Sequence, residues 1–254
     1  GDIIQFCRYL PLLEQKGAGI TFKVKPNLHA LLQTMDSNSR LVTSLPEESE
    51  IDFETRLMSL PHLLNTRLET IPATNPYLFA DQKRVQVWGE RVSTDQFKVG
   101  ICWQGKKAKA DLGRSFPLSL FEGISRIPNV ELISLHKGEG EAQLAGIDFD
   151  VTTLGHDFDA GQDAFLDTAA VMMNCNLIIT ACTSVAHLAG AIGRPTWVAL
   201  KQTPDWRWML DRPDSPWYPT MTLYRQKSLG NWVDVFDTIE WDLRTMLKQK
   251  RHQK

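Results

Sequence analysis

From residue 99 onward, short apolar runs alternate with longer stretches that have helical spacing. The apolar runs are 99–103, 131–135, 177–180 and 196–200, and the helical stretches between them are 118–127, 164–173 and 183–192. This order predicts parallel strands joined by crossover helices, because a tight turn cannot connect two parallel strands. The runs are apolar throughout, as expected where helices cover both faces of a sheet. We therefore predict an α/β fold with a doubly wound parallel sheet.

A shorter alternation precedes this series. It comprises a helical stripe at 3–13, a strand at 20–24, a short helix after Pro26, and extended pieces near 41–42 and 51–53. Such a unit normally has a strand before the loop Gly1-Asp2, so this Rossmann-like lobe is expected to lack its first strand. A polar helix at 81–91 follows. We place the boundary between the lobes near residue 95, with one lobe at 1–95 and a second at 96–254 that ends in a crossover helix at 232–246.

Composition excludes several classes of protein. A formal charge of -2 and a pI near 6.3 provide no overall field that would attract nucleic acid or an anionic membrane. The longest apolar runs are too short to span a bilayer. The four cysteines, which are Cys7, Cys102, Cys175 and Cys182, form no C-x-x-C pair. Their spacing argues against a metal site or a disulfide framework and predicts a reducing, cytoplasmic location. The basic residues at 250–254 are interpreted as a solvated tail.

The strongest local signal is the strand 177–180, a small turn, and a helix opened by Thr183-Ser184. Either hydroxyl can cap the helix, and the free N–H groups of a first helical turn can bind a phosphate. His187 lies one turn further on the same face. This pattern also describes an ordinary capped helix with a core histidine. A diphosphate site is the functional interpretation.

The run from Thr183 to Pro195, followed by Asp205-Trp206-Arg207-Trp208 and the segment 211–219, resembles the C-terminal glycosyltransferase domain of bacterial TPR-repeat proteins. That domain is similar to the ADP-heptose lipopolysaccharide heptosyltransferases of glycosyltransferase family 9 and, more distantly, to O-GlcNAc transferase. The resemblance covers nearly the whole chain. It implies a GT-B fold, in which two Rossmann-like lobes face a cleft, with 1–95 as the acceptor-side lobe and 96–254 as the nucleotide-sugar-binding lobe. It also implies a nucleoside-diphosphate sugar as donor, no metal, and possible TPR repeats upstream.

The resemblance further implies roles for individual residues. Asp2 matches the aspartate of the family's Gly-x-Gly-Asp loop, which acts as general base. Arg114 matches a basic residue that contacts the diphosphate, and Lys106, Lys107 and Lys109 are nearby. Glu139 or Glu141, after Lys137, resembles the glutamate that holds the donor ribose or base. The remaining predicted substrate-binding residues are Trp103, Gln104, Cys182, Thr183, Ser184 and His187.

Cys182 departs from the family's pattern, because heptosyltransferases have aspartate there. A thiol is a weaker acceptor for sugar hydroxyls, so the donor sugar does not transfer from the resemblance. A nucleophilic thiol is the less favoured interpretation of Cys182, since no catalytic histidine partner is evident. The aromatic residues at 206, 208, 217 and 218 either stack on a sugar or base or anchor a loop.

The sequence thus predicts an inverting, metal-independent transfer of a sugar to a hydroxyl of a glycan or protein acceptor. A degenerate GT-B module that binds nucleotide without turnover is the alternative. An NAD-dependent oxidoreductase is disfavoured, because no G-x-G-x-x-G follows any predicted strand.

Overall fold

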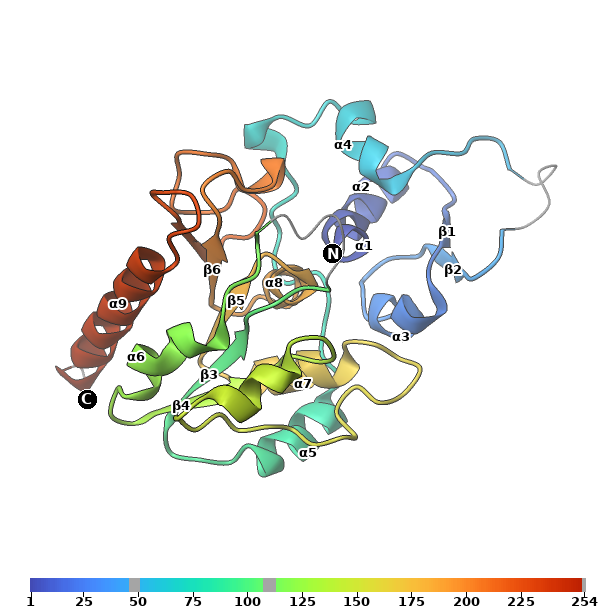
Figure 1. The fold of residues 1–254 in the computed structure, drawn as a ribbon. Coiled ribbons are helices and arrows are strands. Elements are labelled where there is room, and N and C mark those ends of the chain that lie inside the picture. The colour runs from blue at the N-terminus through green and yellow to red at the C-terminus, as the bar shows by residue number, and fades with distance from the viewer. Residues whose placement is uncertain (46–50, 107–112, 253–254) are drawn as a thin grey trace.

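The computed structural model describes residues 1–45, 51–106 and 113–252. A five-stranded parallel sheet forms its centre, in the spatial order β4-β3-β5-β6-β7 (Figure 1). The strands are β3 (Phe97–Cys102), β4 (Val130–Ser134), β5 (Leu177–Ala181), β6 (Thr196–Leu200) and β7 (Met221–Arg225). The predicted α/β fold with a doubly wound sheet is confirmed.

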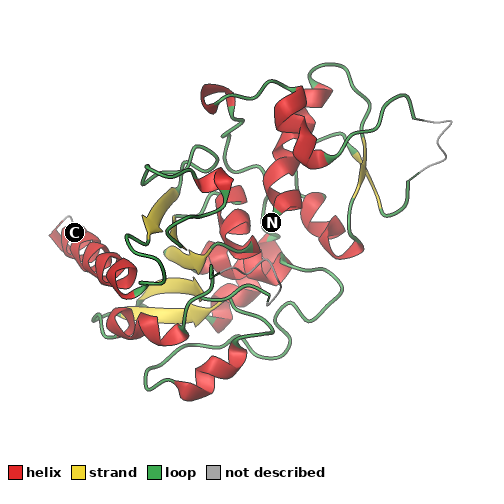
Figure 2. Ribbon diagram, turned by 45° about the horizontal axis from the view of Figure 1, so that its top comes forward, coloured by secondary structure: helices red, strands yellow, loops and turns green. Residues whose placement is uncertain are grey.

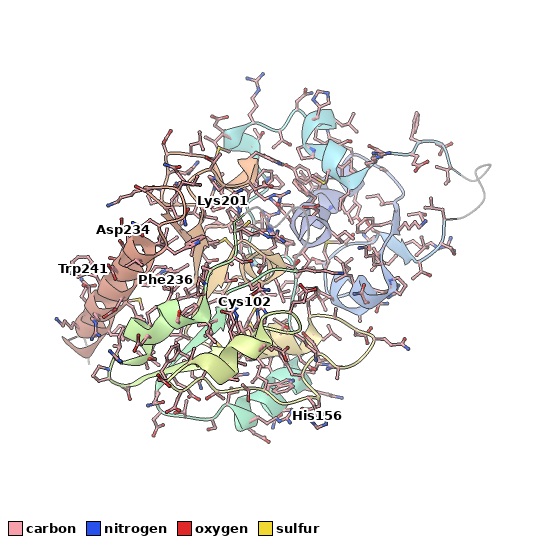
Figure 3. All side chains as sticks on the ribbon, viewed as in Figure 1. Cys102, His156, Lys201, Asp234, Phe236 and Trp241 are labelled. Carbon is pink, nitrogen blue, oxygen red and sulfur yellow. The ribbon has the colours of Figure 1, made fainter. Side chains whose placement is uncertain are left out.

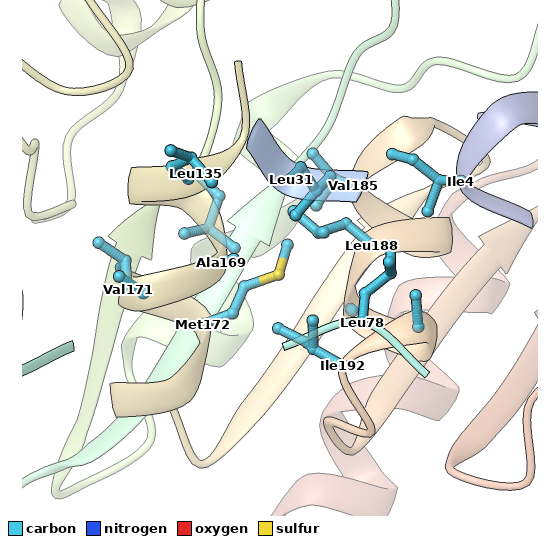
Figure 4. Packing of buried hydrophobic residues seen from close by; sticks show 14 of the residues in the cluster. Ile4, Leu31, Leu78, Leu135, Ala169, Val171, Met172, Val185, Leu188 and Ile192 are labelled. Carbon is cyan, nitrogen blue, oxygen red and sulfur yellow. The ribbon is translucent and has the colours of Figure 1, made fainter. Parts of the chain in front are cut away.

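Helices cover both faces of this sheet (Figure 2). Strand residues of alternating parity face opposite sides, so Ile178 packs in one core and Ile179 in the other. The first face is covered by α5 (Gln82–Arg91), α7 (Leu166–Asn174) and α8 (Ser184–Ala191). The second face is covered by η6 (Leu118–Phe121), α6 (Glu122–Ser125) and α9 (Val233–His252). Figure 4 shows the first core, where Met172 of α7 lies close to Leu188 of α8 and to Ile192, the residue that follows α8.

The residues before α5 form a smaller unit beside this sheet. A nearly continuous helical segment comprises α1 (Asp2–Phe6), η1 (Cys7–Tyr9) and α2 (Leu10–Glu14). The strands β1 (Thr21–Lys23) and β2 (Arg40–Val42) pair in parallel, with η2 (Pro26–Leu28) and α3 (His29–Leu32) between them. The short helices η4 (Leu57–Ser59), α4 (Leu60–Leu63) and η5 (Leu68–Thr70) follow.

One expectation about secondary structure is wrong. Residues 51–53 form no strand, and Phe53 is almost fully exposed. The helix α9 presents the stripe 235, 236, 239 and 243 to the sheet and leaves Val233 exposed. The strand β7 lies outside the elements predicted from the sequence. It is a short edge strand that pairs with β6, and an isolated antiparallel bridge joins its Thr222 to Asp214.

The helix α5 belongs by position to the predicted range 1–95, yet it packs against α7 of the large sheet. Trp88 Nε1 and Arg84 Nη1 both donate to Asp167 Oδ1, at 2.9 and 2.5 Å. Asn174 Nδ2 donates to the carbonyl of Val85 at 2.8 Å. These contacts join α5 to the second unit, while the exact lobe boundary near residue 95 stays a prediction.

The strand order creates a topological switch point. β3 lies between β4 and β5, so the chain runs to opposite sides after β3 and after β5. In open parallel sheets, ligands bind beyond the carboxyl ends of the strands at such a point. Here those ends are Cys102 and Ala181, and the start of α1 lies close to them (Figure 1).

Candidate active site

A cavity of about 410 Å³ lies beyond the carboxyl ends of β5 and β6, against the first turn of α1. Its lining residues are Gly1, Asp2, Arg114, Cys182, Thr183, Ser184, His187, Leu200, Lys201, Pro204, Asp205 and Arg207. The structure therefore brings together six of the residues predicted to bind or react with substrate, although they are spread over 186 positions of sequence between Asp2 and His187. Cationic side chains in the lining outnumber the carboxylates, which suits an anionic ligand.

The N-terminus of α8 forms one wall of this cavity. Thr183 caps the helix, and its Oγ1 accepts a hydrogen bond from Val185 N at 3.2 Å. Helix geometry leaves the other first-turn N–H groups without intrahelical acceptors, and the helix dipole adds partial positive charge there. Because Thr183 and Ser184 both line the cavity, this end of α8 can receive a phosphate.

Replacing Thr183 by alanine tests the role of this cap. We expect the loss of the cap to lower the free energy of unfolding by about 1 kcal/mol, and to weaken nucleoside-diphosphate binding about tenfold because the first-turn N–H groups are no longer held. Asp81→Ala is the matched control, since Asp81 caps α5 in the same way, accepting from Arg84 N at 2.8 Å. Urea unfolding and calorimetric titration with UDP and ADP measure both effects. Equal nucleotide affinity in the two variants would contradict this role.

Asp2 lies in the first turn of α1, also lines this cavity, and is held by an arginine from far along the chain. Arg207 Nη2 donates to Asp2 Oδ1 at 3.0 Å, and Arg207 Nε lies 3.4 Å from Asp205 Oδ1. The side chain of Arg207 is 10% exposed and that of Asp2 is 54% exposed. The carboxylate is thus oriented by a buried cation but remains open to the cavity. Gly1 precedes it where a Cβ atom would lie 2.9 Å from Cδ2 of His187.

His187 was interpreted either as a core histidine or as a residue of the binding site. In the structure it is buried and also lines the cavity. Its Nδ1 lies 2.9 Å from the hydroxyl of Tyr218, and its ring stacks on Trp208 with centroids 5.4 Å apart. Burial, together with the positive charges of Arg207 and Arg8, lowers the pKa of His187 well below its usual value. The imidazole is therefore neutral at neutral pH.

The pKa of His187 predicts how stability depends on pH. Its unfolded pKa is about 6.5, so below that pH the unfolded chain binds a proton that the folded chain does not, and stability falls as pH falls. Below pH 6.5, this histidine makes the unfolding free energy fall by up to about 1.4 kcal/mol for each pH unit. His187→Gln should remove this part of the slope between pH 6.5 and 5, whereas His156→Gln, at an exposed position (Figure 3), should not. Urea unfolding across that range measures it, and an unchanged slope in His187→Gln would refute the assignment.

Cys182 fills the turn between β5 and α8. Trp208 Nε1 donates to its Sγ at 3.0 Å, and burial raises the pKa of the thiol. A helix N-terminus would favour a thiolate, but burial opposes it more strongly here. The geometry therefore favours the interpretation of Cys182 as a small residue in a tight turn. It disfavours the interpretation of Cys182 as a nucleophile.

Arg114 reaches the cavity from the segment after β3. A Cβ atom at Gly105 would lie 2.9 Å from Nη2 of Arg114, so the absence of a side chain at Gly105 makes room for the guanidinium. Lys106 is exposed and does not line the cavity. Lys107 and Lys109 lie outside the described residues.

Four of the predicted substrate-binding residues do not line the cavity. Trp103 is buried, stacks on His136 with centroids 4.3 Å apart, and donates from Nε1 to the carbonyl of Gly140 at 3.3 Å. Gln104 Oε1 accepts from Gln143 Nε2 at 3.0 Å. Lys137 Nζ donates to the carbonyl of Phe158, and Glu139 is exposed. All four follow β3 or β4, at the same edge of the sheet, and their contacts with substrate stay predictions.

Lys201, Asp205 and Arg207 line the cavity but were not among the predicted site residues. They follow β6, and β7 holds their loop in place. Arg225 of β7 donates from Nη2 to the carbonyls of Trp208 and Met209, at 3.1 and 3.0 Å. The run Asp205-Trp206-Arg207-Trp208 carried the only signal, since it places two charged residues beside two tryptophans in the loop after a predicted strand.

The described parts of the chain contain no group of three or more His, Cys, Asp or Glu placed to hold a metal ion. Within the same parts, every helix is too short or too polar to cross a membrane.

A five-stranded parallel sheet and a smaller α/β unit, meeting at a cavity beyond the strand ends, define the GT-B type of fold. The chain is similar in structure to a glycosyltransferase family 9 protein from Veillonella parvula DSM 2008, with a TM-score of 0.53 and 14% sequence identity over 98% of this chain and 79% of that chain. A weaker similarity, with a TM-score of 0.49 and 12% identity, links it to the Escherichia coli ADP-heptose lipopolysaccharide heptosyltransferase II, over 70% of this chain and 57% of that chain.

In sequence, the chain is 29% identical over 194 residues to Protein FlbA of Caulobacter vibrioides (strain ATCC 19089 / CIP 103742 / CB 15). The match covers 73% of this chain and 31% of FlbA, so the chain spans about a third of that protein's length. No family model matches the chain.

Proposed function

We propose that this chain is a glycosyltransferase domain that moves a sugar from a nucleoside diphosphate to an acceptor hydroxyl. One observation carries the proposal. The carboxylate of Asp2 and the N-terminus of α8 line the same cavity at the switch point of a parallel sheet, where α1 packs against α8. Sugar transfer needs this pairing, because it requires a base for the acceptor and a positive site for the departing diphosphate.

In the proposed reaction, the first turn of α8, Arg114 and Lys201 bind the diphosphate of the donor. Asp2 removes the proton of the acceptor hydroxyl as its oxygen attacks the anomeric carbon. The bond between that carbon and the β-phosphate oxygen breaks, and its electron pair stays on the phosphate. A single displacement of this kind inverts the anomeric centre. The proposal assigns charge neutralisation to protein groups, so activity is expected to persist in EDTA.

Binding of nucleotides tests the first half of the proposal. Titration calorimetry of the full chain with UDP, ADP, GDP and CMP, with and without EDTA, should identify one base that binds with micromolar affinity. Arg114→Ala should weaken that binding about tenfold or more, because it removes a charged hydrogen-bond donor from the diphosphate. Absence of binding to every nucleotide would overturn the proposal.

A nucleotide-binding module without turnover is the second candidate, and two observations favour it. Cys182 stands where the heptosyltransferases have aspartate, and its Sγ accepts from Trp208. Asp2 is already engaged by Arg207. Release of nucleoside diphosphate from the donor sugar, followed over time, separates the candidates. Binding with no release beyond the uncatalysed rate would favour the module.

The place of this domain in its full-length protein is also a proposal. The resemblance in sequence favours TPR repeats elsewhere in that protein, and sequencing the whole gene tests this. The four cysteines are free thiols, which is consistent with the proposed cytoplasmic location. Fractionation of cells that produce the tagged full-length protein tests the location.

A further inference from the structure

Tyr218 is a fully buried tyrosine that plays no part in the reaction proposed above. It has no exposed surface, and its hydroxyl lies 2.9 Å from Nδ1 of His187. Tyr218 comes from the segment before β7 and His187 from α8, so this contact joins residues 31 positions apart. In a neutral histidine, the hydrogen bond made by one ring nitrogen decides whether the other nitrogen carries the proton. The contact therefore bears on what His187 offers to a ligand.

The second nitrogen of His187 lies on the side of the ring that faces α1. A Cβ atom at Gly1 would lie 2.9 Å from Cδ2 and 3.4 Å from Nε2 of His187, and both residues line the cavity. The ring is also held in place, because it stacks on Trp208 with an interplanar angle of 18°. Nδ1 thus lies on the side of Tyr218, and Nε2 lies on the side of Gly1 and the cavity.

Several contacts favour Tyr218 as the donor in this hydrogen bond. Burial raises the pKa of Tyr218 to about 12, so its hydroxyl keeps the proton, and the positive charge of Arg8 opposes that rise and polarises the O–H bond. The guanidinium carbon of Arg8 lies 4.4 Å from the centroid of the Tyr218 ring. The neighbouring hydroxyl of Tyr77 already accepts from Arg8 Nη2 at 2.8 Å and donates to the carbonyl of Ile4 at 2.9 Å. The bare nitrogen of a neutral imidazole is therefore the better acceptor for the Tyr218 proton.

We propose that Tyr218 is a positioning residue, which fixes His187 as the neutral tautomer that carries its proton on Nε2 and offers it to the cavity. That N–H lies one helical turn from the first-turn N–H groups of α8, so the helix and the histidine both present donors to an anionic ligand. With the proton on Nδ1, a lone pair of Nε2 would face the ligand and repel a phosphate oxygen. The inference rests on the proposed function for the identity of the ligand, but the tautomer can be measured without any ligand.

Heteronuclear NMR of the full chain, with its histidine ring nitrogens labelled, measures the tautomer directly. The chain has six histidines, and the signal of His187 is the one that His187→Gln removes. In the wild type, Nε2 of His187 should carry the proton and Nδ1 should be bare. Tyr218→Phe keeps the aromatic ring but removes the hydroxyl, so both tautomers should then be populated.

Tyr224→Phe is the matched control for this measurement. Tyr224 is also a buried tyrosine, but its hydroxyl donates to Asp242 Oδ2 at 2.8 Å, between β7 and α9. This substitution should leave the His187 signal as it is in the wild type. Thermal melting of each variant checks its folding. The wild-type spectrum alone can overturn the inference, so the test stays decisive if Tyr218→Phe does not fold.

Nucleotide affinity gives a second readout, because a positioning residue acts only through the residue that it positions. Calorimetry with UDP, ADP and GDP should show that Tyr218→Phe binds about threefold to tenfold more weakly than the wild type, whereas Tyr224→Phe binds equally well. The double variant of Tyr218→Phe and His187→Gln should bind as His187→Gln does alone. A merely structural role of Tyr218 would instead weaken binding equally with and without His187.

Two tautomer results would overturn the inference: a wild-type His187 with its proton on Nδ1, or Tyr218→Phe with the tautomer of the wild type. Additive losses of affinity in the double variant would overturn it as well. A wild type that binds none of the three nucleotides contradicts the proposed function, and the tautomer measurement then decides this inference by itself. Nucleotide binding that is as strong in Tyr218→Phe as in the wild type contradicts only the role of Tyr218.

Discussion

Replacing Asp2 by asparagine is expected to lower the rate of sugar transfer roughly 10²- to 10⁴-fold, the usual contribution of a general base. The amide oxygen of asparagine can still accept the hydrogen bond that Arg207 Nη2 donates, at 3.0 Å in the wild type, so the geometry of the first turn should persist. The amide cannot take a proton from the acceptor hydroxyl. Nucleotide affinity should be unchanged or higher, because a negative charge has left the lining of the cavity.

Asp234→Asn provides the control for this experiment. Asp234 also lies in the first turn of a helix, but on α9, which packs on the opposite face of the sheet (Figure 3). Single-turnover transfer with a radiolabelled donor measures the chemical step, and calorimetry measures nucleotide binding. If Asp2→Asn and Asp234→Asn transferred sugar at the same rate, Asp2 would have no part in the mechanism.

Replacing Trp208 by alanine is expected to cost about 3 to 5 kcal/mol of unfolding free energy, as for other fully buried large side chains. The indole of Trp208 has no exposed surface. It donates to Cys182 Sγ and stacks on His187, so it supports two residues that line the cavity. The substitution should therefore also weaken nucleotide binding, because the turn before α8 loses its support.

Trp241→Ala is the reference for the stability measurement, since Trp241 is 66% exposed and should change the unfolding free energy by less than about 0.5 kcal/mol. Urea unfolding followed by circular dichroism gives both values. If Trp208→Ala lowered the unfolding free energy by less than about 1 kcal/mol, the positions of Cys182 and His187 in the cavity lining would not depend on this ring.

Local patterns in the sequence predicted most of the large sheet. The strands β3, β4, β5 and β6 are short apolar runs between helical stretches, so their identity does not depend on distant residues. The turn before α8 was predicted for the same reason, because capping and the free N–H groups of a first turn are properties of a few adjacent residues. The strand β7 was not predicted, because it is an edge strand of five residues of mixed polarity. Its formation depends on pairing with β6.

Because β7 was not predicted, Arg207 was not identified as a site residue. Arg225 of β7 fixes the loop that carries Asp205 and Arg207, and without that strand the loop has no predictable position. The ion pair between Asp2 and Arg207 joins residues 205 positions apart, and nothing in the local sequence of either reports the other. The local sequence also did not show that Trp103 and Lys137 stay outside the cavity. Their side chains donate hydrogen bonds to the backbone carbonyls of Gly140 and Phe158.

The alternation of strands and helices and the capped turn at Thr183 were readable from the chain alone, because hydrophobic periodicity and backbone capping act within one or two turns of structure. The composition of the cavity was not readable in that way. Which charges face Asp2, which aromatic rings support the loop after β6, and which predicted residues stay outside all depend on packing between distant segments. Such contacts form only when the sheet brings its carboxyl ends beside α1.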